Sequence, residues 1–419
     1  MKKITIILFL LLACSKMLQA QHIESLTLHQ YLEKVGKSNL NYGAEKLNVS
    51  AARADAIAAK VFNDPQFSFS YTNNQDHSMQ MGQSVEVGLS QTLSLGKRGA
   101  NIRLTRSQSE LTEALLADYF RNLRAEATNA YLDVQKQKQL FAVKQESYSS
   151  MCEIAKSDSI RFRAGKIMEI EAIQSKLEAD MMHNEVLQSE TDLKNACVSL
   201  SLMTGSASRD TLYHAEGDLQ HLERDFSLDK LITYAVDNRS DLLAAMKNTE
   251  VARRAIVVAR RDKLPDVDVS LAVNHNNQVR NEEAPAPSYN GITAGIAFPL
   301  KFSSLNKGAL QAAKFRAQQA ELQYDQARLQ VQTEVMQAYQ SFQSLSDQLK
   351  HYQGGMLTKA KEILRGKIYS YNRGEVPLLE ILNAQRTYNE VQSAYIETLH
   401  GYNAALVELE RTVGIWDLD

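Results

Sequence analysis

The chain has 419 residues, of which 44% are hydrophobic, and its formal net charge at pH 7 is −2. Such a balanced charge gives no basic excess for binding nucleic acid, and only 6 prolines and 18 glycines favour long uninterrupted helices. The sequence contains no nucleophile motif, phosphate-binding loop or spaced metal-ligand cluster, so we expect neither an enzyme nor a bound cofactor.

The N-terminus has the pattern of an export signal. Lys2 and Lys3 precede an apolar run over 4–13, and small residues follow. A signal peptide over 1–20, cleaved after "LQA", is the reading that we favour. In the alternative, "LLAC" resembles a lipoprotein box whose Cys14 would carry the lipid. No later segment has 18 consecutive apolar residues, so we expect an exported chain without a transmembrane helix.

The remaining sequence is a duplication. A first repeat over 21–205 and a second over 226–419 are joined by a linker at 206–225. The stretch "LTLHQYLEKVGKSN" matches "FSLDKLITYAVDNR", and Pro65 matches Pro265. Each repeat then reads as short helix, helix, strand, strand, long helix, turn and long helix. Because several offsets agree independently, the duplication is a strong signal.

Four short segments alternate as strands do. They are expected at about 66–72, 84–92, 267–273 and 291–299. Apolar side chains would share one face, and polar side chains, including Glu86 and Asp268, would share the other. In a soluble sheet the apolar face is buried, whereas in an outer-membrane barrel it meets lipid and the polar face lines the lumen.

The strand number indicates how such a barrel would form. Four strands cannot close a barrel, and open edges in lipid are prohibitively costly. Three copies would supply twelve strands, which enclose an aqueous channel. We therefore predict a homotrimer in contact with outer-membrane lipid.

Long helices make up the rest of each repeat. They are predicted over about 99–162 and 168–204, and over about 306–371 and 376–413. A helix over 99–162 would be roughly 95 Å long at 1.5 Å per residue. Apolar residues spaced by three and four predict antiparallel coiled-coil packing of each pair.

These features resemble the TolC-type outer-membrane efflux protein family. The resemblance rests on the duplicated unit, on "YNRGEVPLLEILNAQRTY" at the second turn and on "AFPL" after the fourth strand. It implies a mostly helical chain with a small membrane β part: a trimeric twelve-stranded barrel continued by a long periplasmic helical barrel. It also implies an exit duct in the outer membrane that works with a periplasmic adaptor protein and an inner-membrane efflux pump.

The stretch "QTLSLGKRG" is similar to the heavy-metal branch of the family, which exports cobalt, zinc and cadmium or copper and silver. That similarity implies metal cations or small toxic compounds as substrates. Two alternatives stay open: an exported coiled-coil scaffold with a soluble sheet, and a member of the family that serves protein or lipid export.

The resemblance also implies site residues near the two helical turns. Acidic residues just after the second turn constrict the pore in this family, and a ring of three carboxylates favours cations. The turn glycines, Gly165 and Gly374, are the expected contact with the adaptor. The gate positions implied here are Glu380, Asn383, Glu171 and Gln174, with Tyr371 and Arg373 as holders of the closed turn. Asn383 departs from the acidic pattern, so a second ring would be uncharged.

Three further groups of residues have simple structural explanations. His77, Met79 and Met81 could hold copper, but a loop that carries these residues by chance is the reading that we favour. Cys152 and Cys197 could form a disulfide, but we interpret them as two lone small hydrophobes. The basic run Arg253, Arg254, Arg260, Arg261 and Lys263 approaches the third strand, where cations would reach towards lipid headgroups.

Overall fold

The computed structural model describes residues 22–74, 80–205, 211–221, 223–300 and 307–418. The chain divides into two compact units. The first consists of the described residues within 1–45, 117–240 and 329–419, and the second of those within 46–116 and 241–328. Each unit contains corresponding segments of both repeats, so the duplicated halves of the sequence are not two separately folded halves.

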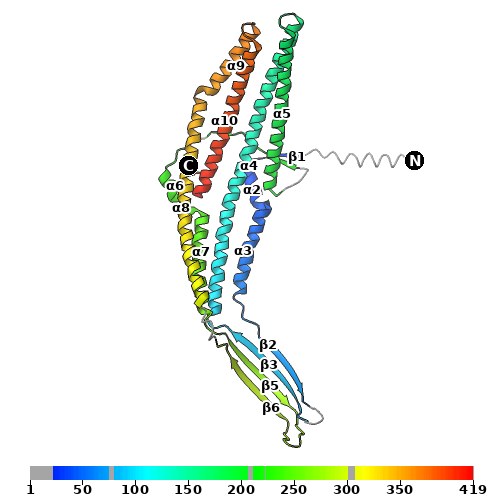
Figure 1. Ribbon diagram of the computed structural model, residues 1–419, viewed down its shortest axis with the longest axis vertical. Helices are drawn as coiled ribbons and strands as arrows, with labels where there is room; N and C mark the ends of the chain where they lie inside the picture. Colours follow the sequence, from blue (N-terminus) through cyan, green and yellow to red (C-terminus); the bar gives the residue numbers. More distant parts are fainter. Residues whose placement is uncertain (1–21, 75–79, 206–210, 222, 301–306, 419) are drawn as a thin grey trace, which may run out of the picture. The chain divides into compact units, whose positions relative to one another are not determined.

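A four-stranded sheet forms part of the second unit (Figure 1). Its strands are β2 (Gln66–Asn73), β3 (Gln83–Leu93), β5 (Val267–Asn276) and β6 (Tyr289–Ala297). They pair in the order β2-β3-β5-β6, and every pair is antiparallel. The two repeats therefore meet between β3 and β5, and β2 and β6 are the edges.

The strand register places apolar side chains in rows on one face. Phe69 lies opposite Val87, Val87 opposite Val273, and Val273 opposite Ile292. These side chains are exposed, with Ile292 at 76% and Phe69 at 64%. Within the described chain this apolar face has no cover, in contrast to an ordinary soluble sheet.

Helices accompany the sheet in the second unit. They are α3 (Leu40–Ala58), α7 (Ser240–Arg261) and the strand-proximal parts of α4 (Lys97–Arg163) and α8 (Lys307–His351). Three ion pairs connect these helices: Arg53–Glu113 at 2.9 Å, Lys247–Glu110 at 2.8 Å and Arg253–Glu321 at 3.1 Å. Such solvated pairs contribute at most about 1 kcal/mol each, so apolar packing must supply most of the stability.

The first unit contains a small parallel sheet that the sequence did not predict. Strand β1 (His22–Leu26) pairs with β4 (Thr211–Ala215), which lies inside the stretch expected to be a plain linker. The Tyr131 hydroxyl on α4 donates to the carbonyl oxygens of Leu26, the last residue of β1, and of Glu216, the residue after β4, which lie 3.0 and 2.8 Å away. Helices α2 (Leu28–Ser38) and α6 (Leu228–Asn238) belong to the same unit.

Two helical hairpins complete the first unit (Figure 1). In one, α4 is followed by α5 (Glu169–Met203), and in the other α9 (Leu357–Asn372) is followed by α10 (Leu378–Val413). Buried side chains join the members of each hairpin: Met151 and Ala155 with Ala179 and Met182, and Ala360 and Leu364 with Ala384 and Tyr388. The predicted coiled-coil packing thus has a buried apolar seam in both hairpins.

The expectation of one unbroken helix over 306–371 is corrected. Helix α8 ends at His351, and a π-helical turn, η1 (Tyr352–Met356), separates it from α9. The turn contains two successive glycines, and Gly355 has a φ of +114°. Glycine pairs and π-turns are recognised causes of helix kinks, whereas α4 has no such pair and stays continuous.

Several N-terminal and loop predictions lie outside the described residues. These are the signal peptide over 1–20, the lipidation candidate Cys14, and the candidate ligands His77 and Met79. In the parts of the chain that are described, no helix combines the length and apolar character needed to cross a membrane.

Candidate gate and docking turns

The two helical turns share one backbone geometry. In each, the glycine N–H donates to the carbonyl three residues earlier, and the next N–H donates to the carbonyl five residues earlier, at 2.8–2.9 Å. Gly165 has a φ of +68° and Gly374 a φ of +75°. Glycine adopts this left-handed conformation without steric cost, so both positions suit a tight helix stop. An added Cβ at either glycine would meet no atom within 4 Å, so both turns are open to a partner.

A buried polar cluster next to the turns joins the two repeats. The Tyr371 hydroxyl on α9 donates to Oδ1 of Asp158 on α4, 2.8 Å away. Arg161 lies 3.7 Å from the same carboxylate, and its guanidinium carbon is 4.8 Å from the centre of the Tyr371 ring. Asp158 is fully buried and Tyr371 is 5% exposed. The prediction that Tyr371 makes a hydrogen bond at the turn therefore has a specific partner in the other repeat.

Burial controls the protonation of this pair. It raises the pKa of Asp158 above its ordinary value, although the hydrogen bonds from Tyr371 and Ser175 and the charge of Arg161 oppose that rise. Burial, together with the neighbouring carboxylate, also raises the pKa of Tyr371, so the phenol keeps its proton. A phenol that donates to a buried carboxylate is a charge-assisted hydrogen bond, which is stronger than a neutral one.

The acidic gate candidates lie in different surroundings. Glu380 accepts from Lys367 Nζ at 2.8 Å, and both side chains are partly exposed. Glu171 accepts from the Met168 N–H at 3.3 Å and so caps the start of α5. Asn383 and Gln174 are exposed. The structure thus pairs Glu380 with a cation, Lys367, that the sequence pattern did not indicate.

Arg373 acts within its own turn. It donates to the Tyr369 hydroxyl at 2.9 Å and forms a 2.9 Å ion pair with Glu375. Among the described residues it forms no hydrogen bond or ion pair with the other hairpin, so Tyr371 alone of these two candidates bonds across the repeats.

Sequence reasoning missed Asp158 and Lys367, although the duplication contained a signal. The offset of 209 that relates Gly165 to Gly374 also relates Asp158 to Lys367. The charge is therefore reversed at equivalent positions of the two repeats. Lys367 attracts Glu380, whereas Asp158 is repelled by Glu171, the equivalent of Glu380, and instead accepts from Tyr371.

The two lumen candidates lie on the polar face of the sheet. Glu86 is exposed and lies opposite Ser70 on β2 and Asn274 on β5. Asp268 lies opposite Thr92, whose hydroxyl donates to it. Strand register thus places both carboxylates on the face opposite the apolar rows.

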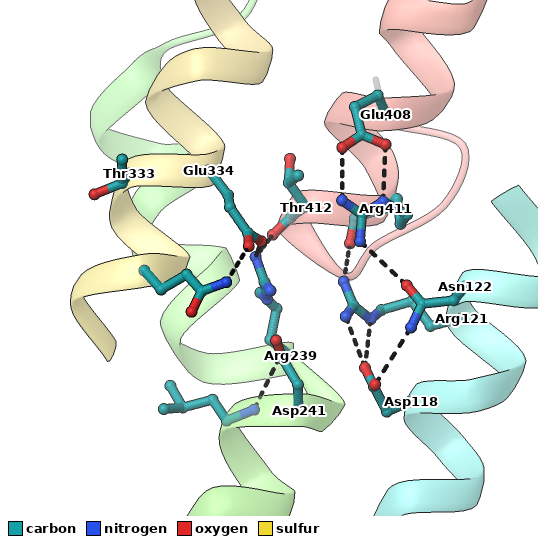
Figure 2. A network of polar contacts seen from close by, with 12 residues as sticks. Asp118, Arg121, Asn122, Arg239, Asp241, Thr333, Glu334, Glu408, Arg411 and Thr412 are labelled. Atoms are coloured by element: carbon teal, nitrogen blue, oxygen red, sulfur yellow. Dashed lines mark hydrogen bonds and ion pairs between the residues drawn. The ribbon is translucent and has the colours of Figure 1, made fainter. Parts of the chain in front are cut away.

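A second polar network, which the sequence did not suggest, surrounds the C-terminus of α10 (Figure 2). Nη1 of Arg121 on α4 donates to the carbonyl oxygen of Arg411 at 2.6 Å, and Nη1 of Arg239 donates to that of Thr412 at 3.3 Å. These carbonyls belong to the last helical turn, which lacks intrahelical donors and carries the negative end of the helix dipole. Two cationic side chains therefore cap α10.

Each arginine of this network has an acidic partner. The closest nitrogen–oxygen distances are 2.6 Å for Arg121–Asp118, 2.7 Å for Arg239–Glu334 and 2.6 Å for Arg411–Glu408. Arg121 and Arg239 are 6% and 3% exposed, so their charges depend on these partners.

The equivalent cap in the first repeat is neutral. There the Asn39 side chain donates to the Met203 carbonyl oxygen at 2.9 Å, in the position that Arg239 and Thr412 occupy in the second repeat. The duplication therefore preserves the capping interaction but changes its chemistry from an amide to a buried ion pair.

The described residues hold no group of three or more histidine, cysteine, aspartate or glutamate side chains that could bind a metal ion. Met81, the described member of the candidate copper loop, is exposed and accepts from Asn281 at 3.7 Å. Cys197 is buried beside His214, with the sulfur 3.6 Å from Nε2, and burial raises the pKa of the thiol to about 11. These side chains show no metal-binding geometry.

Comparison with known proteins gives consistent matches. The family model "Outer membrane efflux protein" matches residues 33–206 and 231–415. The cobalt-zinc-cadmium resistance protein CzcC of Cupriavidus metallidurans is 23% identical over 394 residues, which cover 93% of this chain and 90% of that protein.

Solved structures share the fold. A crystal structure of CusC has a TM-score of 0.76 and 18% identity, covering 93% of this chain and 92% of CusC. The Campylobacter jejuni CmeC outer membrane channel has a TM-score of 0.77 and 16% identity, with 94% and 87% covered.

Proposed function

The chain belongs to the outer membrane efflux protein family, and from this premise we propose that it is the outer-membrane exit duct of a tripartite efflux system. In this role it passes substrates from an inner-membrane pump and a periplasmic adaptor to the outside. The duct needs no chemistry of its own, because the pump supplies the energy.

The uncovered apolar face of the sheet is the observation that carries this proposal. Its rows include Phe69, Val87, Val273 and Ile292, and all of them are exposed. Leaving such a face in water is unfavourable, whereas lipid would solvate it. The soluble-scaffold alternative requires a cover for this face, and the described chain supplies none.

The proposed assembly is a trimer. The free edges of β2 and β6 would pair with β6 and β2 of neighbouring copies, so three chains close a twelve-stranded barrel. Glu86 and Asp268 then face the lumen, because they lie opposite the apolar rows.

The helical turns form the proposed gate and docking end. The Asp158–Tyr371 hydrogen bond holds the two hairpins of one chain together in the closed arrangement. Glu380 contributes one carboxylate of a three-membered ring, partly neutralised by Lys367. Gly165 and Gly374 form the open turns to which the adaptor docks.

Metal cations are the proposed substrates. Support comes from "QTLSLGKRG" and from the similarity, along nearly the whole chain, to a protein named for cobalt-zinc-cadmium resistance. A deletion strain should accumulate these metals, as measured by elemental mass spectrometry, without accumulating dye. Dye accumulation alone would contradict the metal assignment and indicate export of organic compounds.

A pair of neighbouring substitutions tests the membrane placement. Leu89 lies in the apolar rows, and Ser90 lies on the polar face of the same strand. Leu89→Lys should reduce the trimer recovered from the outer membrane, because a cation at mid-bilayer costs about 2–4 kcal/mol. Ser90→Lys, the matched control, should assemble normally. Equal recovery of both variants, or a wild-type chain that fractionates as a soluble protein, would overturn the proposal.

A further inference from the structure

A polar cavity of about 290 Å³ lies in the second unit, where β3 leads into α4. This headgroup cavity, as we name it, is lined among others by Ala58, Phe62, Ser94, Lys97, Arg98 and Asn101. None of its lining residues is an aspartate or a glutamate. Its volume corresponds to roughly ten water molecules, enough for a small hydrated anion.

The two cationic side chains that line the cavity, Lys97 and Arg98, differ in whether an acidic group neutralises their charge. Lys97 Nζ is 3.0 Å from Oδ2 of Asp266, so its charge has a partner. In the described chain Arg98 forms no ion pair: its Nη2 donates to the Lys60 carbonyl oxygen, and its guanidinium carbon lies 3.8 Å from the centre of the Phe62 ring. Its Nε is buried, with no hydrogen-bond acceptor among the described residues. Arg98 therefore brings to the cavity wall a positive charge that no described carboxylate balances.

A second guanidinium lies close by. A Cβ added to Gly96 would be 3.4 Å from Nη1 of Arg261, so Arg261 lies beside the same β3–α4 connection. The side chains of Ser94 and Asn101 can supply uncharged donors. A planar guanidinium group can donate two parallel hydrogen bonds to phosphate oxygens, and the cations and uncharged donors that line the cavity match such an anion.

The surroundings indicate where the phosphate comes from. Val61 and Phe62 are 65% and 63% exposed, and Phe67, at the start of the apolar rows, is 68% exposed. An anion site next to exposed apolar side chains suits a ligand that has both a phosphate and an acyl chain. If the sheet spans the outer membrane, as the proposed function holds, the cavity lies at the periplasmic ends of the strands, level with lipid headgroups.

We propose that the headgroup cavity binds the phosphate of an anionic phospholipid from the periplasmic leaflet of the outer membrane, with Arg98 as its main ligand. The inference rests on the proposed function for the placement of the sheet. The lipid would fix the depth of the β3–α4 connection in the membrane.

Native mass spectrometry of the full chain in detergent, with added phosphatidylglycerol, tests the proposal. Arg98→Gln should weaken lipid binding about tenfold or more, because it removes a charge-assisted hydrogen bond. Ala58→Phe should weaken binding by filling the cavity, while it leaves the bond between Arg98 and Lys60 in place. Arg365→Gln, the same change at an exposed position on α9, is the control and should bind as the wild type does.

Three outcomes would overturn the inference. Equal phosphatidylglycerol binding by all variants would exclude the cavity as the site. Displacement of the lipid by equimolar inorganic phosphate would identify a free-phosphate site. Equal affinity for zwitterionic phosphatidylcholine would remove the preference for an anion. Membrane fractionation tests the proposed function separately. If Arg98→Gln and Ala58→Phe reach the outer membrane and still bind phosphatidylglycerol as the wild type does, the lipid site is wrong and the proposed function is unaffected.

Discussion

Tyr371 and Asp158 join α9 to α4 through one buried hydrogen bond, so in the proposed gate the loss of one hydroxyl group should favour the open state. Tyr371→Phe leaves a buried carboxylate without this donor, which costs about 1–3 kcal/mol. Since 1.4 kcal/mol is a tenfold change in an equilibrium constant, we expect an open population about tenfold larger. Conductance of the purified channel in planar bilayers measures that population.

Tyr369→Phe is the matched control for this substitution. The Tyr369 hydroxyl accepts from Arg373 on the same turn, and its side chain is 62% exposed. Its removal should leave conductance at the wild-type level. An equal rise in both variants would show that the bond between the repeats does not hold the turn.

We expect the stability of the fold to depend on pH through the carboxyl group of Glu334. Burial opposes its ionisation, yet hydrogen bonds from Gln330 and Arg239 lower its pKa below the ordinary value of 4.5. A lowered pKa adds stability that is complete above the ordinary value and is lost as the pH falls through the folded-state value.

Glu334→Gln tests that dependence. At neutral pH it should lower the free energy of unfolding by about 1–3 kcal/mol, because the 2.7 Å ion pair between Glu334 and the buried Arg239 is lost. It should also flatten the fall in thermal midpoint below pH 4.5. Midpoints measured in detergent across this range check both effects, and an unchanged acid profile would remove Glu334 as its cause.

At the scale of elements, two glycines near the second turn should respond oppositely to the same substitution. Gly374 has a φ of +75°, whereas Gly366 lies inside α9, and neither would meet an atom with an added Cβ. Gly374→Ala should destabilise the turn by about 1 kcal/mol through backbone strain. Gly366→Ala should stabilise the helix by a similar amount.

The thermal midpoints of the two glycine variants measure these effects: the midpoint should fall for Gly374→Ala and rise for Gly366→Ala. Pump-dependent export reports whether the second turn also docks the adaptor, and a bulkier Gly374→Val should abolish export while the trimer persists. Normal export by an assembled Gly374→Val trimer would contradict the docking role.

At the scale of the whole molecule, the proposed trimer would bring three Glu380–Lys367 pairs together around one pore. Lys367→Gln leaves the three carboxylates uncompensated and should raise the preference for cations, whereas Glu380→Gln should lower it. Reversal potentials in asymmetric KCl measure both shifts. Identical potentials for the two variants would place the pair away from the pore.

Local periodicity made much of this fold predictable. Alternation in "FSFSY" and "VEVGL" predicted which side chains share a face, and the register confirms that Phe67, Phe69 and Tyr71 lie opposite Leu89, Val87 and Val85. The turn glycines were equally accessible, because a helix that reverses tightly needs a left-handed residue at its end. Both features depend on residues that are close in sequence.

Other features were not accessible from local sequence. Strands β1 and β4 have five residues each, which is too short for a clear periodic signal. They lie far apart along the chain, and each is stabilised by pairing with the other. In the sequence, Asp158 and the arginines around α10 look like ordinary charged surface residues. Their burial removes water from them, and their partners then determine the energy of their charges.

The sequence by itself determined the duplication, the two strand faces, the helical hairpins and the family, because each is written in spacing or in order along the chain. Only the tertiary structure decided that the two repeats contribute jointly to both units, that Tyr371 meets Asp158, and that Arg98 donates to a carbonyl oxygen and forms no ion pair with any described residue. The physical reason is that periodicity sets which side of an element is apolar. The energy of a charged side chain depends on which groups, often distant in the sequence, lie next to it in the fold. It also depends on how far the fold exposes that side chain to water.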